Sequence, residues 1–220
     1  MTTLSHGQSG LGDQRTSGSS STHFDLVVLA ASAGGLKALS AIVSGLPAAF
    51  PVPLALVLHR SQQLPHMLAE VLGRRTALMV RTAMAGETPT AGTIYVAPSD
   101  RHLSITQERT FALTDGERIH HTHSAADPLF LSAAAVYGNR VVAVVLTAGA
   151  DDAAEGARAI GLAGGIVIAQ NQATSQVFSM PQATIATGHA DTILAIEDIA
   201  PALMRLIEKG SLGSTFVHSS

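Results

Sequence analysis

The segment LVVLAASAGGLKAL, residues Leu26 to Leu39, joins a continuous apolar run to a helical pattern through one serine and two glycines. The run LVVLAA predicts a buried β-strand, and the residues from Gly35 onward predict a helix with apolar residues at helical spacing. Ser32 lies between the two. Taken alone, its hydroxyl fits a turn residue, a helix N-cap, a phosphate ligand or a nucleophile, and the N-cap is the commonest of these roles.

The same alternation of apolar runs and helical patterns continues along the chain. Apolar runs recur at VPLALVLH, RVVAVVLT, GIVIAQ and TIL, and helical patterns follow at LPHMLAEVLGRR, DDAAEGARAIGLAGG and IEDIAPALMRLIEKG. This alternation predicts an α/β fold with a doubly wound, mostly parallel sheet and helices on both faces. The middle segment GTIYVAPSDRHLSITQERTFALTDGER has short runs broken by turn residues. We therefore expect hairpins there, and an antiparallel hairpin extension of the sheet.

One domain accounts for the 220 residues of the chain. We place it at residues 24–209, because the apolar patterning begins and ends there. Residues 1–23 are rich in Ser, Gly and Thr, and residues 210–220 are similarly polar and small. Both segments are typical of flexible tails.

Composition excludes several classes of function. Hydrophobic residues make up 46% of the chain, the net charge is -3, and no Lys/Arg run offers a basic surface to nucleic acid. The absence of cysteine excludes disulfides, thiolate catalysis and cysteine zinc sites. No apolar run is long enough to cross a bilayer, and no signal-peptide core occurs at the N-terminus. We expect a cytoplasmic protein that binds no nucleic acid and does not insert into membranes.

Candidate catalytic side chains follow three of the predicted strands. They are Ser32 after LVVLAA, His59 after VPLALVL, and the pair Asp151 and Asp152 after RVVAVVLTAGA. Each has a commoner structural role when it is considered alone: a helix cap, a hydrogen-bonded histidine, or acids favoured by a helix dipole. Ligands of open α/β sheets bind beyond the carboxyl ends of strands, so all three would meet at one edge. A serine, a histidine and a carboxylate at one edge are the components of a nucleophilic triad.

The two glycines after Ala33 allow a tight turn and bring helix N–H groups close to the serine. Such N–H groups can hold an oxyanion or a phosphate. The phosphate alternative is weaker, because the segment is not GxGxxG and no Walker lysine follows it. The segment also lacks the GxSxG spacing of α/β-hydrolases, so we do not expect a standard lipase or esterase.

The remaining histidines do not form a recognisable metal motif. His120, His121 and His123 lie close together with His102 upstream, but no HExxH or partnered carboxylate accompanies them. We expect a solvated loop there and no metal site. His66, in the helical pattern LPHMLAEVL, is a rival to His59 as the base.

Four segments together resemble a known family. VVLAASAGGLKAL, GTIYVAPSDRHLSI, VVLTAGADDAAEG and IAQNQATSQVFSMPQA, in this order, are similar to the catalytic domain of the chemotaxis protein-glutamate methylesterases, over about Phe24 to Leu206. The resemblance implies a doubly wound α/β domain with a Ser-His-Asp triad and no cofactor. It implies hydrolysis of glutamyl γ-methyl esters on the cytoplasmic helices of methyl-accepting chemoreceptors, with deamidation of glutamines in some members.

The resemblance also assigns roles to residues. Ser32 in ASAGG is implied as the nucleophile, His59 as the base, and Asp152 in TAGADDA as the orienting carboxylate. Backbone N–H groups near the serine and in the TAGA loop are implied to hold the oxyanion and contact the substrate, which gives Ala33, Gly34, Gly35 and Gly149.

This sequence departs from the family pattern around these positions. The family typically reads G-x-S-x-G-G and T-G-M-G-x-D-G, and often R-P-S-V-D where residues 123–127 read HSAAD. The replaced glycines and methionine raise the question of a changed turn and a wider pocket. They are Ala30, Ala148, Gly149, Ala150 and Ala153.

Family members commonly carry a phosphoacceptor receiver domain before the catalytic domain. About 22 residues precede the first predicted strand here, so we expect regulation to be absent, supplied by a regulator in trans, or exerted by another route. Two alternatives to a chemoreceptor methylesterase stay open. One is a non-catalytic receptor-binding module of the same fold, and the other is an esterase that acts on a substrate outside chemotaxis.

Overall fold

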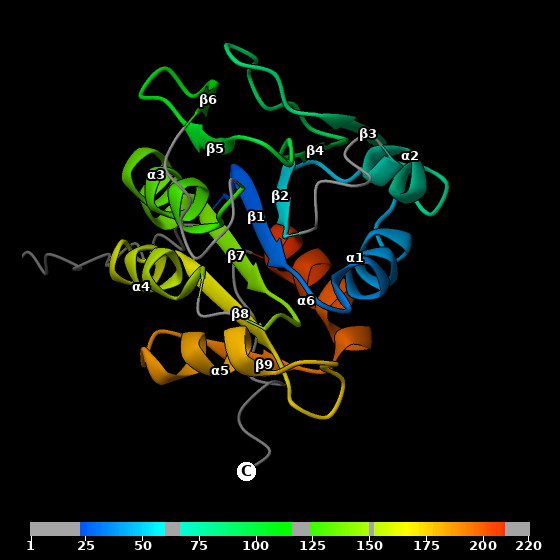
Figure 1. Ribbon diagram of the computed structural model, residues 1–220, viewed down its shortest axis with the longest axis vertical. Coiled ribbons are helices and arrows are strands. Elements are labelled where there is room, and N and C mark those ends of the chain that lie inside the picture. The colour runs from blue at the N-terminus through cyan, green and yellow to red at the C-terminus, as the bar shows by residue number, and fades with distance from the viewer. Residues whose placement is uncertain (1–22, 60–66, 116–123, 150–151, 210–220) are drawn as a thin grey trace, which may run out of the picture.

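The computed structural model (Figure 1) describes residues 23–59, 67–115, 124–149 and 152–209. Both predicted tails lie almost wholly outside these ranges. In chain order the elements are β1 (Leu26–Ala31), α1 (Gly35–Ser44), β2 (Leu54–Leu58), α2 (Met67–Gly73), β3 (Met79–Thr82), β4 (Thr93–Val96), β5 (His102–Ile105), β6 (Phe111–Thr114), α3 (Asp127–Tyr137), η1 (Gly138–Arg140), β7 (Val141–Val145), α4 (Ala154–Leu162), β8 (Ile166–Gln170), α5 (Ser179–Ala186), β9 (Thr192–Leu194) and α6 (Ile196–Lys209).

The main sheet has the strand order β3-β4-β2-β1-β7-β8-β9, and every pairing in it is parallel. β1 lies in the middle, between β2 and β7. β2, β3 and β4 lie on one side of β1, with β4 between β2 and the edge strand β3, and β7, β8 and β9 follow in order on the other side. The helices that follow β1 and β7, α1 and α4, pack on opposite faces of the sheet, so the order of the strands reverses between β1 and β7.

Both faces of the sheet are buried, which explains the uninterrupted apolar strands. Along β1, Val27 and Leu29 pack into the core under α1, α2 and α6. Leu26 and Val28 pack into the opposite core, under α3 and α4. Figure 1 shows these two groups of helices on opposite sides of the sheet. The predicted doubly wound α/β fold is confirmed.

The middle of the chain differs in part from the sequence-based expectation. The segment of β4 was expected in a hairpin, but it pairs in parallel with β2 and β3 and is fully buried. Only β5 and β6 form an antiparallel hairpin, and this hairpin is a separate two-stranded sheet. It packs on α3, where the N–H of Ile105 donates to the Ser132 hydroxyl at 2.9 Å.

Among the described residues, no helix is both long enough and apolar enough to cross a membrane.

Candidate active site

Ser32 directly follows β1 and does not cap the next helix. The N-cap of α1 is Gly34, which makes no side-chain capping bond. The backbone N–H of Ser32 donates to the carbonyl of Thr147, at 3.0 Å, and so ties the end of β1 to the loop after β7. Within the described residues the hydroxyl has no hydrogen-bond partner. The helix-cap alternative is therefore wrong, and the hydroxyl remains available to a ligand.

The two glycines after Ala33 are both required by the local geometry. Gly34 has φ +77°, in the left-handed region, and a Cβ there would lie 2.6 Å from Oε1 of Gln176. A Cβ on Gly35 would lie 2.6 Å from Cδ1 of Leu58. A side chain at either position would therefore push α1 away from its neighbours and displace the turn that holds Ser32.

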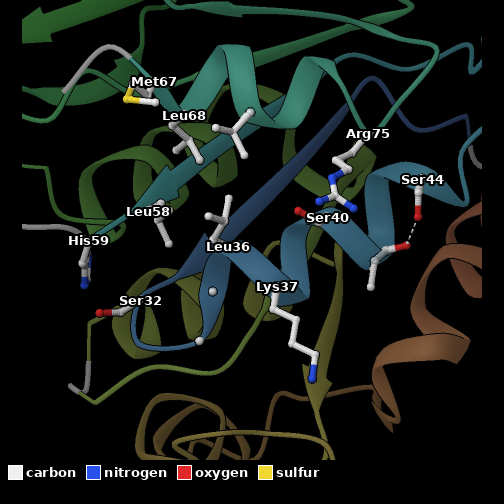
Figure 2. A pocket seen from close by; sticks show the side chains of 14 residues that line it. Ser32, Leu36, Lys37, Ser40, Ser44, Leu58, His59, Met67, Leu68 and Arg75 are labelled. Carbon is white, nitrogen blue, oxygen red and sulfur yellow. Dashed lines mark hydrogen bonds between the residues drawn. The ribbon is translucent and has the colours of Figure 1, made fainter. Parts of the chain in front are cut away.

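The register of the sheet places His59 beside Ser32. Ala31 of β1 is opposite Leu58 of β2, and the N–H of His59 continues this pairing by donating to the carbonyl of Ala31 at 2.9 Å. Ser32 and His59, which directly follow these two strands, are therefore neighbours at about the spacing of adjacent strands, about 4.8 Å. Figure 2 shows the imidazole and the hydroxyl at the same end of one pocket. They are not hydrogen-bonded to each other, a bond that often tightens only when substrate binds.

Asp152 contacts the histidine from the side of β7. Its Oδ2 lies 2.5 Å from Nε2 of His59, at ion-pair distance, and that nitrogen makes no hydrogen bond in the described part of the chain. Nδ1 is therefore the ring nitrogen left to face a substrate or the serine. The structure thus brings His59 and Asp152 into contact and places Ser32 next to them.

The Asp152 carboxylate also completes the start of α3. Oδ2 accepts the N–H of Ala126 at 2.6 Å, and Oδ1 accepts the N–H of Asp127 at 3.1 Å. These are donors that a helix N-terminus cannot satisfy internally, and the helix dipole favours an anion there. Asp127 in turn accepts the N–H of Gly156 through Oδ1 at 2.8 Å, which joins α3 to α4.

These contacts decide the charge of Asp152. The carboxyl is fully buried, and burial acts to raise its pKa. The contact with His59 and the N–H donors of Ala126 and Asp127 act in the opposite direction, and together they hold the pKa of Asp152 below its ordinary value. The group is therefore a carboxylate at neutral pH, as a residue that orients and stabilises an imidazolium must be.

A second network fixes the loops around Ser32. The side chain of Gln170, at the end of β8, accepts the N–H of Thr147 at 2.9 Å and donates to the carbonyl of Thr174 at 2.9 Å. The Thr147 hydroxyl lies 2.9 Å from the carbonyl of Ala33 and accepts the N–H of Val177. Gln170 is almost completely buried, so it acts as a rigid bridge between the loops after β1, β7 and β8.

This network orients several N–H groups. In a trans peptide the C=O and N–H point in opposite directions. Because Thr147 binds the carbonyl of Ala33, the N–H of Gly34 points away from Thr147. Likewise the carbonyl of Ala148 accepts the N–H of Met180, so the N–H of Gly149 points away from α5.

The N–H groups of Ala33, Gly34 and Gly149 have no acceptor within the described residues. That of Gly35 donates to the carbonyl of Ser32 at 2.8 Å, so its role in the turn is steric.

Sequence reasoning assigned no role to Thr147 and Gln170. A signal was present for both, because each is a polar residue at the carboxyl end of an otherwise apolar strand. Sequence reasoning also gave no helix for residues 127–137, since α3 is apolar on most sides and lacks the polar stripe that reveals helical periodicity.

The other histidines are placed only in part. His102 is buried at the start of β5, and its Nδ1 accepts the N–H of Ala125 at 3.2 Å. His66, His120, His121 and His123 lie outside the described residues, as do Ala150 and Asp151. No group of three or more potential metal ligands comes together in the described ranges.

The sequence and fold match known proteins. The CheB methylesterase family matches residues 27–203. This chain belongs to the CheB methylesterase family. A crystal structure of the Thermotoga maritima CheB methylesterase catalytic domain superposes with a TM-score of 0.80 at 34% sequence identity, covering 83% of this chain and 98% of that one.

Two curated relatives illustrate the family match. One, from Anaeromyxobacter dehalogenans, is named protein-glutamate methylesterase/protein-glutamine glutaminase 2. It is 41% identical over 83% of this chain, and the match spans 53% of the relative. Another, from Leptospira interrogans, is named a putative protein-glutamate methylesterase/protein-glutamine glutaminase, and is 30% identical over 84% of this chain and 95% of the relative. The chain thus spans about half the length of the first relative and nearly all of the second.

Three residues that depart from the CheB methylesterase pattern lie within or next to the candidate site. Ala30 lies within β1 and pairs regularly with Val57 and Val145, so it does not alter the turn. Gly149 has room for a side chain among the described residues, because a Cβ there would meet only Val177 of these, at 3.9 Å. Ala153 has φ +73°, in the left-handed region, where the family pattern has glycine.

We expect Asp152→Asn to destabilise the fold in a pH-dependent way. The lowered pKa means that the carboxylate stabilises the folded state above the ordinary carboxyl pKa of about 4, and that this stabilisation is lost as the pH falls through the lower folded-state value. The variant should lose about 1–3 kcal/mol of unfolding free energy at pH 7, since its NH₂ cannot accept both N–H groups. Urea titrations should show a smaller difference in unfolding free energy between wild type and Asp152→Asn at pH 3 than at pH 7. The exposed Asp100→Asn should show no such difference, and a constant deficit for Asp152→Asn would contradict the assignment.

Ala153→Gly tests the strained position beside Asp152. Relief of the left-handed conformation is worth about 1–2 kcal/mol, and it opposes the loss of a buried methyl, about 0.8 kcal/mol, and the backbone entropy of glycine, about 0.5–1 kcal/mol. The free energy of unfolding should therefore change by less than about 1 kcal/mol. Ala157→Gly, equally buried within α4, has no strain to relieve and should lose about 2 kcal/mol in the same urea titration. Equal losses would show that Ala153 is not strained.

Proposed function

We propose that this chain is a serine esterase that removes methyl esters from glutamyl side chains of chemoreceptors. The observation that carries the proposal is the contact of His59 Nε2 with the buried Asp152 carboxylate at 2.5 Å, in register with Ser32 across β1 and β2. A structural histidine needs no such partner, whereas a general base needs one that fixes its tautomer and stabilises its protonated form. The family match supports the same chemistry.

In the proposed reaction, Ser32 is the nucleophile. Its Oγ attacks the γ-carbonyl carbon of the glutamyl ester while His59 takes the hydroxyl proton through Nδ1, because Nε2 faces Asp152. The tetrahedral intermediate collapses as His59 returns the proton to the methoxy oxygen, and methanol leaves. Water then attacks the acyl-enzyme with His59 again as base, and glutamate is released. A glutamine side chain would follow the same steps with ammonia as the leaving group.

The oxyanion of the intermediate would be held by backbone N–H groups. Those of Ala33, Gly34 and Gly149 lack acceptors in the described part of the chain. The N–H of Gly34 points away from Thr147 and that of Gly149 away from α5, because the preceding carbonyls are bound there. Donors fixed in this way need no reorganisation as negative charge develops, which is the main source of their effect on rate.

The partners follow from the proposed substrate. They are the cytoplasmic helices of methyl-accepting chemoreceptors, and the reaction would take place in the cytoplasm. The triad itself requires no cofactor. A regulator in trans stays a prediction.

Methanol release from methylated receptor membranes tests the proposal. Wild-type protein should release methanol, and Ser32→Ala should lower kcat by at least about 10³-fold, because its nucleophile is gone. His59→Ala should have a similar effect. Far-UV circular dichroism of each variant controls for folding.

Two results would contradict the proposal in different ways. Equal inactivity of wild type and Ser32→Ala on receptors and on small methyl esters would favour the non-catalytic binding module. Turnover of small esters that depends on Ser32, without any release from receptors, would favour an esterase with another substrate.

A further inference from the structure

A groove runs from Ser32 and His59 between α1 and α2 (Figure 2), and we call it the α1–α2 groove. Its volume is about 870 Å³. That is within the range of pockets that enclose whole small-molecule ligands, so it is far more than one glutamyl ester side chain fills. The ester would occupy only the end at Ser32, and the rest of the groove is free for the chain that carries it.

The walls of the groove are apolar yet open to solvent. Leu36 of α1 is 42% exposed and Met67 of α2 is 49% exposed, and both line the groove with Leu58 and Leu68. Large apolar side chains gathered in one open depression beside a candidate active site indicate a surface that is covered when a partner binds.

The charge of the groove has one sign. Lys37 and Arg75 are its charged lining residues in the described part of the chain, and no Asp or Glu lines it there. Figure 2 shows the Lys37 side chain directed away from α2, whereas Arg75 points across toward α1 at the level of Ser40. Arg75 makes no ion pair with any described residue, while its neighbour Arg74 pairs with Glu70 at 2.5 Å. Arg75 is therefore the cation that the groove offers to an acidic group.

The spacing along α1 defines where that acidic group would lie. Ser40 is five residues beyond Gly35, or about 7.5 Å along the helix axis. In a helical substrate lying along the groove, residues four and seven positions from the ester lie about 6 and 10 Å away along its axis. Both values are close to the 7.5 Å between Gly35 and Ser40, so a side chain at these positions would lie at the level of Arg75 when the ester lies at Ser32.

We propose that the α1–α2 groove selects, among the helices that carry a glutamyl ester, those with a matching charge, and that Arg75 is the selecting cation. In the selected helix one face is apolar. Its apolar face lies on Leu36 and Met67, and an acidic side chain four to seven residues from the ester pairs with Arg75. This inference rests on the proposed function, because that function places the ester at Ser32.

Binding of a synthetic peptide tests the groove without requiring hydrolysis. The probe is a fluorescent helical peptide of about 15 residues, with leucines on one face and a central glutamine in place of the ester. One peptide has Glu at the positions four residues before and after the central glutamine. The control peptide has Gln at both of these positions. Fluorescence anisotropy is measured with the full Ser32→Ala chain. We expect the Glu peptide to bind roughly five- to tenfold more tightly at low salt, and the difference to shrink at 0.5 M salt.

Matched variants in the Ser32→Ala background assign the preference to the groove. Arg75→Glu should abolish or reverse the preference for the Glu peptide, and Arg74→Glu, on the adjacent residue outside the groove, should keep it within about twofold. Leu36→Ser should weaken binding of both peptides equally.

Equal affinity for the two peptides, or an effect of Arg74→Glu as large as that of Arg75→Glu, would overturn the inference. A charge preference that depends on Arg75 would support binding in the groove even if wild-type protein released no methanol from any ester. The binding test and the methanol test can therefore fail independently.

Discussion

The buried carboxylate of Asp152 is the group on which the candidate site depends. It lies two residues before α4, accepts the first N–H groups of α3, and contacts His59 after the end of β2. One residue thus joins both sides of β1. Burying this anion without its partners would cost several kcal/mol. The fold therefore needs the carboxylate and its partners together. The side chain that contacts His59 also binds the start of α3, one of the helices that cover the sheet.

The location of the site follows from features that the sequence displays. Continuous apolar strands require a parallel sheet, and such a sheet brings its carboxyl ends to one edge, where Ser32, His59 and Asp152 were predicted to meet. The pairing of β1 with β2 then makes two of these residues neighbours. The left-handed φ of Gly34 and the close packing of Gly35 show why two glycines follow the serine turn.

Other parts could not be predicted, for physical reasons that can be named. α3 has no polar stripe, so its periodicity is weak. The short apolar run of β4 is equally compatible with a hairpin and a central strand until its neighbours are known. The bridge from Gln170 through Thr147 to Ala33 joins residues far apart in sequence, and only the fold brings them together. Ala153 occupies a left-handed conformation that its sequence neighbours do not reveal.

The central claim is that Ser32 is a nucleophile activated by His59 and Asp152. The most direct measurement is mass spectrometry of the chain after timed reaction with a sulfonyl fluoride, which loses fluoride to an activated serine oxygen. The account predicts one adduct, on Ser32, that forms in wild-type protein and at least about 10²-fold more slowly in His59→Ala, because the base is missing. An adduct on another residue, or labelling of Ser32 at the same rate in both proteins, would contradict it.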